Sequence, residues 1–123
     1  SRNRINERPV SAELGCVTPV FVVPGVWSRS EMEYHATSIV SMVTNNGSFN
    51  CVAAKALVTA SGWPQRDEFL EIFRQRLAKA ASRHAYYPGA QERYDAMLSH
   101  YPDAEVVGQT GEGEPGMMEW SRP

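Results

Sequence analysis

An uninterrupted apolar run over Pro19–Val23 is the sequence feature that most restricts the fold of this chain. It contains three valines, and Pro24-Gly25 follows at once as a turn signal, which is typical of a short strand buried on both faces. Strands of this kind occur mainly in parallel sheets, where a helix connects one strand to the next. The run is also far shorter than the roughly 20 apolar residues that a membrane-spanning helix needs. The pattern therefore predicts a strand in an α/β fold.

The next segment has the start signal, periodicity and stop signal of a helix. Ser28 is a typical N-cap, and Glu31 three residues later completes a capping box. Asn45-Asn46-Gly47 ends the pattern, because Asn and Gly tolerate the left-handed conformation that follows many helices. Apolar residues recur at helical spacing and predict one buried face: Met32, Ala36, Ile39, Val40 and Val43.

Further elements are predicted on both sides of this helix. They are strands at 8–14, 56–60 and 104–107, and helices that begin at Pro64 and Ala90, the first with a buried stripe of Phe69, Leu70, Phe73, Leu77 and Ala80. Their order predicts α/β, a parallel sheet with flanking helices. Ligands bind such sheets beyond the carboxyl ends of the strands, and Gly15 and Gly47 are predicted to lie in loops of that kind.

Composition narrows the class of protein. The 123 residues carry a net charge of −2, so nothing indicates nucleic acid or an anionic membrane as a partner. Two cysteines are too few for a secreted disulfide scaffold, and a cytoplasmic location is expected. After residue 107 the chain becomes rich in Gly and Glu. We expect one domain over 1–107 and a loop or tail over 108–123.

Two glycine-flanked stretches have the residue types of a nucleophile and a base. Residues 45–55 carry Cys51 after the turn at Gly47, and residues 9–16 carry Glu13 just before Gly15. A thiol and a carboxylate, each beside a glycine turn, suit covalent catalysis with a general base.

These motifs resemble those of the aldehyde dehydrogenase superfamily. The resemblance covers about residues 9–77 and rests on Glu13-Leu14-Gly15, on Pro19, and on Asn45-x-Gly47 followed by Cys51. Three positions depart from the family pattern. Cys16-Val17 replaces Gly-Lys, Ser48 replaces Gln, and Cys51 lies four residues after Gly47 where the family has three.

The resemblance implies a partial catalytic domain of an NAD(P)-dependent oxidoreductase. Cys51 would attack a small-molecule aldehyde, hydride would pass to NAD or NADP, and Glu13 would activate water to hydrolyse the thioester. Gly15 is assigned to cofactor binding. A complete member of the family is several times longer, and the half that mainly binds the cofactor is missing here, so we expect a fragment that is inactive alone. We also expect it to self-associate as a homo-oligomer through exposed apolar surface.

The same residues also allow other interpretations. Cys51 suits a buried apolar residue as well as a nucleophile, and Glu13 suits a solvated loop. Cys16 suits either a redox partner of Cys51 or a residue with a structural role only. Asn45 and Asn50 suit either hydrogen-bond donors to a substrate oxygen or residues that end the helix. The histidines show no metal-ligand spacing, and Gly111-x-Gly113-x-x-Gly116 follows no predicted strand, as a dinucleotide motif would. The whole chain also suits a non-catalytic relative that binds a ligand or partner, or an unrelated small α/β interaction domain.

Overall fold

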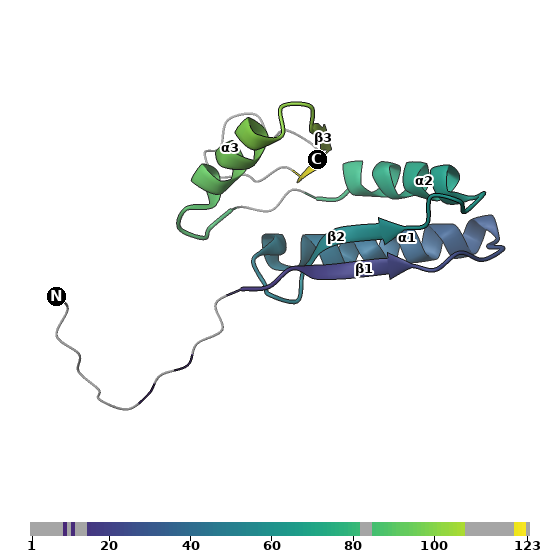
Figure 1. Ribbon diagram of the computed structural model, residues 1–123, viewed down its shortest axis with the longest axis horizontal. Coiled ribbons are helices and arrows are strands. Elements are labelled where there is room, and N and C mark those ends of the chain that lie inside the picture. The colour runs from purple at the N-terminus through teal and green to yellow at the C-terminus, as the bar shows by residue number, and fades with distance from the viewer. Residues whose placement is uncertain (1–8, 10, 12–14, 82–84, 108–119, 123) are drawn as a thin grey trace, which may run out of the picture.

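The computed structural model describes residues 9, 11, 15–81, 85–107 and 120–122. Its elements are, in chain order, β1 (Thr18–Val22), α1 (Arg29–Thr44), a 3-10 turn η1 (Asn45–Ser48), β2 (Ala54–Thr59), α2 (Arg66–Ala78), α3 (Ala90–His100), β3 (Glu105–Val107) and β4 (Trp120–Arg122). Figure 1 shows β1, β2, α1 and α2 together as one layered unit, with α3 beside it. Mixed helices and strands agree with the predicted α/β class.

The first two strands form a parallel pair, as predicted. Their register runs from Thr18 opposite Ala54 to Val22 opposite Thr59, with one irregularity after Thr18. The strand predicted at 8–14 lies almost wholly outside the described residues, and Pro9 and Ser11 have no regular structure.

The last predicted strand does not extend this sheet. β3 pairs instead with β4 in a separate antiparallel sheet, in which Glu105 lies opposite Arg122. The prediction of one parallel sheet was therefore wrong for this strand. Val107 at its end is buried with Val40 of α1 and Leu77 of α2, so β3 packs against the helices rather than beside β1 or β2. β4 lies in the part of the chain that was predicted to be a loop or tail.

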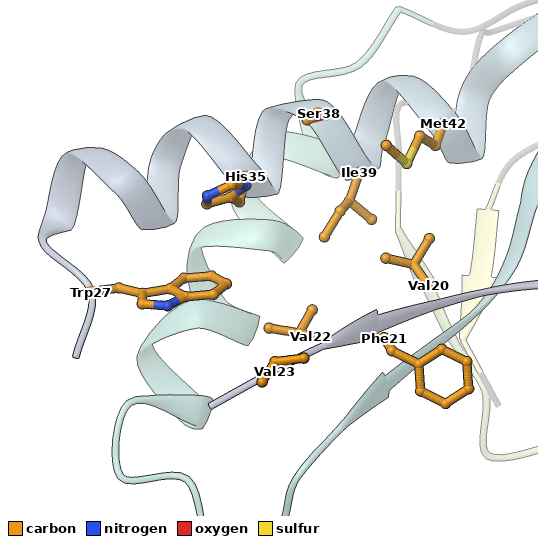
Figure 2. A pocket seen from close by; sticks show the side chains of 9 residues that line it. All are labelled: Val20, Phe21, Val22, Val23, Trp27, His35, Ser38, Ile39 and Met42. Carbon is orange, nitrogen blue, oxygen red and sulfur yellow. The ribbon is translucent and has the colours of Figure 1, made fainter. Parts of the chain in front are cut away.

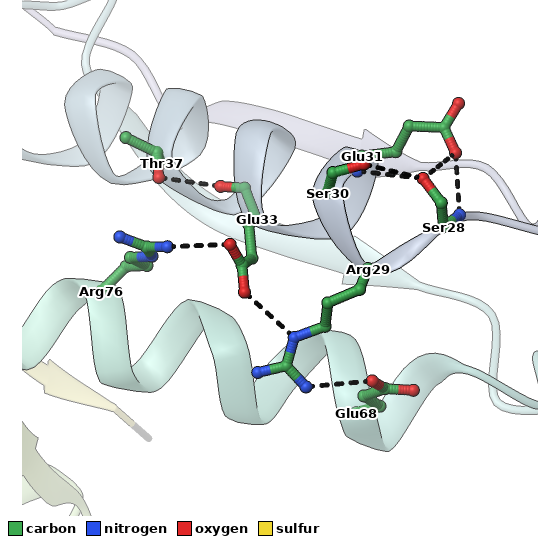
Figure 3. Close-up of polar contacts among 8 residues, drawn as sticks. All are labelled: Ser28, Arg29, Ser30, Glu31, Glu33, Thr37, Glu68 and Arg76. Atoms are coloured by element: carbon green, nitrogen blue, oxygen red, sulfur yellow. Dashed lines mark hydrogen bonds and ion pairs between the residues drawn. The ribbon is translucent and has the colours of Figure 1, made fainter.

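The predicted cap and buried face of α1 are both confirmed. The Ser28 side chain accepts a hydrogen bond from the Glu31 amide, and a Glu31 carboxylate oxygen accepts one from the Ser28 amide at 2.8 Å (Figure 3). Met32, Ala36, Ile39 and Val40 are buried, and Val43 is half-buried. The helix ends at Thr44, directly before the Asn-Asn-Gly stop signal.

α2 begins at Arg66, two residues after the predicted start at Pro64. The intervening residues form a turn, and the Gln65 side chain binds the loop before α1. Its amide oxygen accepts a hydrogen bond from the Trp27 backbone and its amide nitrogen donates one to the Trp27 carbonyl, each at 2.8 Å. Phe69 and Leu77 of the predicted stripe are buried, while Leu70 and Phe73 are half-buried.

The main core lies between α1, α2 and one face of the β1–β2 sheet. Its buried members are Val22, Met32, Ala36, Ile39, Trp63, Phe69 and Ile72. Trp63 is anchored by a hydrogen bond from its indole nitrogen to the Gly25 carbonyl at 2.8 Å. Because the indole N–H is hydrogen-bonded, the Trp63 ring adds apolar contacts to the core without leaving a buried donor unsatisfied.

Charged side chains connect the outer surfaces of α1 and α2. Glu33 pairs with Arg29 on its own helix at 3.0 Å and with Arg76 of α2 at 3.2 Å, and Arg29 also reaches Glu68 (Figure 3). The hydrogen bond from Arg29 holds the pKa of the Glu33 carboxyl below its ordinary value. These pairs are solvent-exposed, so they orient the two helices more than they stabilise them.

The other face of the β1–β2 sheet is apolar and open. Phe21 is 67% exposed, Val58 beside it is 42% exposed, and Val23 also points outward. Within the described part of the chain, no helix covers this face. In the same residues, no helix is both long and apolar enough to cross a membrane.

Candidate functional site

The loops that precede β1 and β2 meet at one rim of the sheet. The Cys16 thiol donates a hydrogen bond to the Cys51 carbonyl at 2.6 Å, and the Thr18 hydroxyl donates to the same oxygen at 2.8 Å. Because β1 and β2 are parallel and in register from Thr18 and Ala54, their leading loops are held side by side. Cys16, the last residue of one stretch singled out in the sequence, thus contacts the stretch that carries Cys51.

This rim is the amino end of the two strands, whereas Gly15 and Gly47 were predicted in loops at carboxyl ends. That prediction was wrong for Gly47, which follows α1 and precedes β2. Gly15 likewise lies three residues before the start of β1, and the strand predicted to end there lies almost wholly outside the described residues.

Cys51 lies in a turn and is exposed to solvent. Its exposure excludes the interpretation in which it is a buried apolar residue. Cys16 is exposed as well, and both cysteines are free thiols. Glu13, the predicted base, lies outside the described residues, so its role stays a prediction.

The backbone before Cys51 has an unusual conformation. Asn46, Gly47 and Ser48 have φ values of 50°, 61° and 64°, three left-handed residues in succession, of which only one is glycine. Non-glycine residues in this region are strained, and such strain gathers at functional sites. The Ser48 hydroxyl is also buried without a hydrogen-bond partner among the described residues. Both features show that this turn is held in an energetically unfavourable conformation.

Three asparagine side chains hold the turn in place. Asn50 donates to the Asn45 side-chain oxygen at 2.6 Å, and Asn46 donates to Asn50 at 2.9 Å. Asn46 also donates to the Tyr86 hydroxyl at 2.9 Å, and the Phe49 ring packs against those of Tyr86 and Tyr87. The amides of Asn45 and Asn50 therefore bond to each other, and the helix ends at this point, as the stop-signal interpretation expects.

Lys55 completes the rim, and sequence reasoning gave it no role. Its ammonium group donates to the carbonyls of Asn50 and Ala53, at 3.2 and 2.9 Å, and so spans the turn that carries Cys51. Partial burial lowers the pKa of Lys55, and electrostatic interaction with Cys16 and Cys51 opposes that shift. The sequence signal that could have indicated this role is a lysine at the start of an apolar strand, four residues after Cys51.

A shallow groove lies elsewhere, along α1 and β1. It has a volume of about 270 Å³ and is lined by Val20, Phe21, Val22, Val23, Trp27, His35, Ser38, Ile39 and Met42. Figure 2 shows the Phe21 ring on the far side of β1 from Ile39. Among the described residues, His35 belongs to no cluster that could hold a metal ion and instead lies against Trp27 with ring centres 4.9 Å apart.

Among the described residues, the turn from β1 to α1 leaves no room for the phosphates of a dinucleotide. The turn from β1 to α1 is where phosphates would bind, but a side chain at Gly25 would lie 2.6 Å from the Trp27 indole, so this turn is filled by the protein itself. A side chain at Gly15 would meet no atom of the described residues within 4 Å, so no close approach among them explains glycine there. The motif from Gly111 to Gly116 is outside the described residues.

Comparison with protein-family models, curated proteins and solved structures gave no significant match.

Proposed function

We propose that the rim formed by Cys16, Cys51 and Lys55 is an aldehyde-reactive thiol site of the aldehyde dehydrogenase type, with Cys51 as nucleophile. The observation that supports this proposal is the hydrogen bond from Cys16 to the Cys51 carbonyl. It connects residues 35 apart in the sequence, namely Cys51 and the cysteine that follows Glu13-Leu14-Gly15.

The chemistry begins with an addition that needs no cofactor. The Cys51 sulfur attacks the carbonyl carbon, a carbon–sulfur bond forms, and the carbonyl π electrons move to oxygen, which takes a proton to give a thiohemiacetal. Lys55 interacts electrostatically with Cys51, so its positive charge would favour the negative charge that develops during the attack. Thr18 and Lys55 fix the backbone on either side of Cys51, which keeps the thiol at the exposed rim.

Oxidation of the adduct would use NAD or NADP, and Glu13 would be the base for the hydrolysis that follows. The resemblance places most of the binding site of that cofactor outside this chain, so we derive no hydride step from it. The proposal is accordingly limited to recognition of an aldehyde and its capture by the thiol.

Competitive alkylation tests the proposal. Iodoacetamide labelling followed by peptide mass spectrometry measures Cys51 and Cys16 separately, because Arg29 divides them between two tryptic peptides. We expect Cys51 to react faster than a free peptide of residues 45–55, and propanal to slow that reaction saturably while 1-propanol does not. Cys16→Ser should preserve this protection and Lys55→Gln should weaken it.

A non-catalytic binding function is the second candidate, and the apolar groove along α1 and β1 favours it. In this case a ligand or partner would bind without turnover, and Cys51 would have no special role. Alkylation of Cys51 no faster than the free peptide, with no protection by propanal, would decide for this alternative and against the aldehyde site.

A further inference from the structure

Cys16 and Cys51 are close enough to be chemically coupled. The Cys16 sulfur is 2.6 Å from the Cys51 carbonyl oxygen. Standard bond lengths then place the two Cα atoms no more than about 8 Å apart, against roughly 4.4–6.8 Å in disulfides. Both residues lie outside the strands, one in the loop before β1 and one in a turn. Because hydrogen bonds hold the turn of Cys51, a disulfide requires a new side-chain rotamer and a shift of the loop that carries Cys16.

The surroundings of the pair favour reaction with oxidants. Both thiols are exposed, so a small peroxide reaches either one. Lys55 interacts electrostatically with both sulfurs, and its ammonium is kept in place by two backbone carbonyls. Thiolates are the reactive form of cysteine, and a fixed positive charge attracts them. Redox-sensitive cysteines typically combine exposure, a nearby cation and a second cysteine that resolves the first oxidation product.

We propose that Cys16 and Cys51 form a reversible intramolecular disulfide when the protein meets hydrogen peroxide. The Cys51 thiolate attacks one peroxide oxygen, the O–O bond breaks, and the protein gains a sulfenic acid while hydroxide leaves and is protonated to water. The Cys16 sulfur then attacks the Cys51 sulfur, a second water leaves, and the S–S bond forms. Two thiols are oxidised, one peroxide is reduced to two waters, and a thiol reductant such as dithiothreitol reverses the change.

This inference goes beyond the proposed function and does not depend on it, because it needs only the two sulfurs and Lys55. If Cys51 also captures aldehydes, the disulfide switches that activity off. The aldehyde test uses the reduced protein, so its failure leaves the oxidation test unaffected.

Mass spectrometry under non-reducing conditions tests the disulfide. After a small molar excess of hydrogen peroxide, we expect monomer that has lost two hydrogens, with the peptides of Cys16 and Cys51 linked and separated again by dithiothreitol. Cys16→Ser should accumulate Cys51 carrying added oxygen, since it lacks the resolving thiol. Mainly sulfinic acid or intermolecular dimers in the unaltered protein would overturn the proposal.

The two lysines of the chain supply a matched control for the cation. Lys55→Gln should slow disulfide formation by roughly two- to fivefold, the effect of one exposed charge pair. Lys79→Gln, an exposed change of the same kind outside the rim, should leave the rate unchanged. Equal rates in the two variants would overturn the part of the proposal that assigns a role to Lys55.

Discussion

Asn46 donates a hydrogen bond to the Tyr86 hydroxyl 2.9 Å away, although 40 residues separate them in the sequence. This contact connects the strained turn before Cys51 to the segment that leads into α3. It is reinforced by the Phe49 ring, which packs against Tyr86 and Tyr87. The position of the Cys51 turn therefore depends on a distant part of the chain.

Removal of the Tyr86 hydroxyl should loosen this turn. Tyr86→Phe keeps the ring contacts but takes away the acceptor, and we expect a loss of about 1 kcal/mol in the free energy of unfolding. Hydrogen exchange over residues 46–52 should become faster. Tyr87→Phe is the control, because it removes a hydroxyl from the same aromatic group but leaves the Asn46 bond intact. Equal effects of the two substitutions would contradict a specific role for Tyr86.

The capping box at the start of α1 should contribute to acid sensitivity. Hydrogen bonds from the Ser28 side chain and backbone lower the pKa of Glu31 below its ordinary value of 4.5. A carboxyl whose pKa is lower in the folded state stabilises the fold above the unfolded pKa, and this stabilisation is lost as pH falls through the folded pKa. Below pH 4.5, the unaltered protein should therefore lose stability more steeply than Glu31→Gln.

Urea unfolding at several pH values measures this difference. Gln keeps a side-chain oxygen for the Ser28 amide but has no carboxyl to protonate, so it separates titration from capping. If the free energies of unfolding of the two proteins change by the same amount between pH 3 and 6, Glu31 makes no contribution to acid sensitivity.

Oxidation of the thiol pair should stabilise the fold. A disulfide between Cys16 and Cys51 closes a loop that contains β1 and α1, and loop-closure entropy predicts a gain of about 3–4 kcal/mol. Urea unfolding of the oxidised and reduced protein measures the gain, and Cys16→Ser should show none. A lower unfolding midpoint for the oxidised protein would mean that the disulfide distorts the rim.

The open sheet face should promote self-association, as the sequence predicts. Phe21 and Val58 form an exposed apolar pair on neighbouring strands, and exposed patches of this kind favour contacts between molecules. Phe21→Thr with Val58→Thr should shift the population toward monomer, measured by light scattering at increasing concentration. Val26→Thr is the control, since Val26 is fully exposed in the loop before α1. A clean monomer of the unaltered protein at high concentration would contradict this expectation.

The elements with strong local signals could be predicted from the sequence. Ser28 and Glu31 marked the start of α1, and the valine run marked β1, because capping and β-branched periodicity act over a few residues. The pairing of β3 with β4 could not be predicted, since strands of three residues carry almost no pattern.

The site was only partly predictable. The sequence singled out Cys51 by its turn but placed that turn at the wrong end of the sheet, because local patterns do not fix which strand ends meet. Lys55 was missed for a related reason. Its role depends on its distance from Cys16, which is set by the pairing of β1 with β2 and not by any neighbouring residue.

The five residues of β1 separate two very different chemical environments. The two cysteines lie at the amino end of the β1–β2 pair, and the groove beside Trp27 and His35 lies along the second half of β1. At about 3.3 Å per residue, the strand itself spans roughly 13 Å. Substitutions at one end should leave the other untouched, so this short strand offers protein engineers two sites that are adjustable independently within a small scaffold.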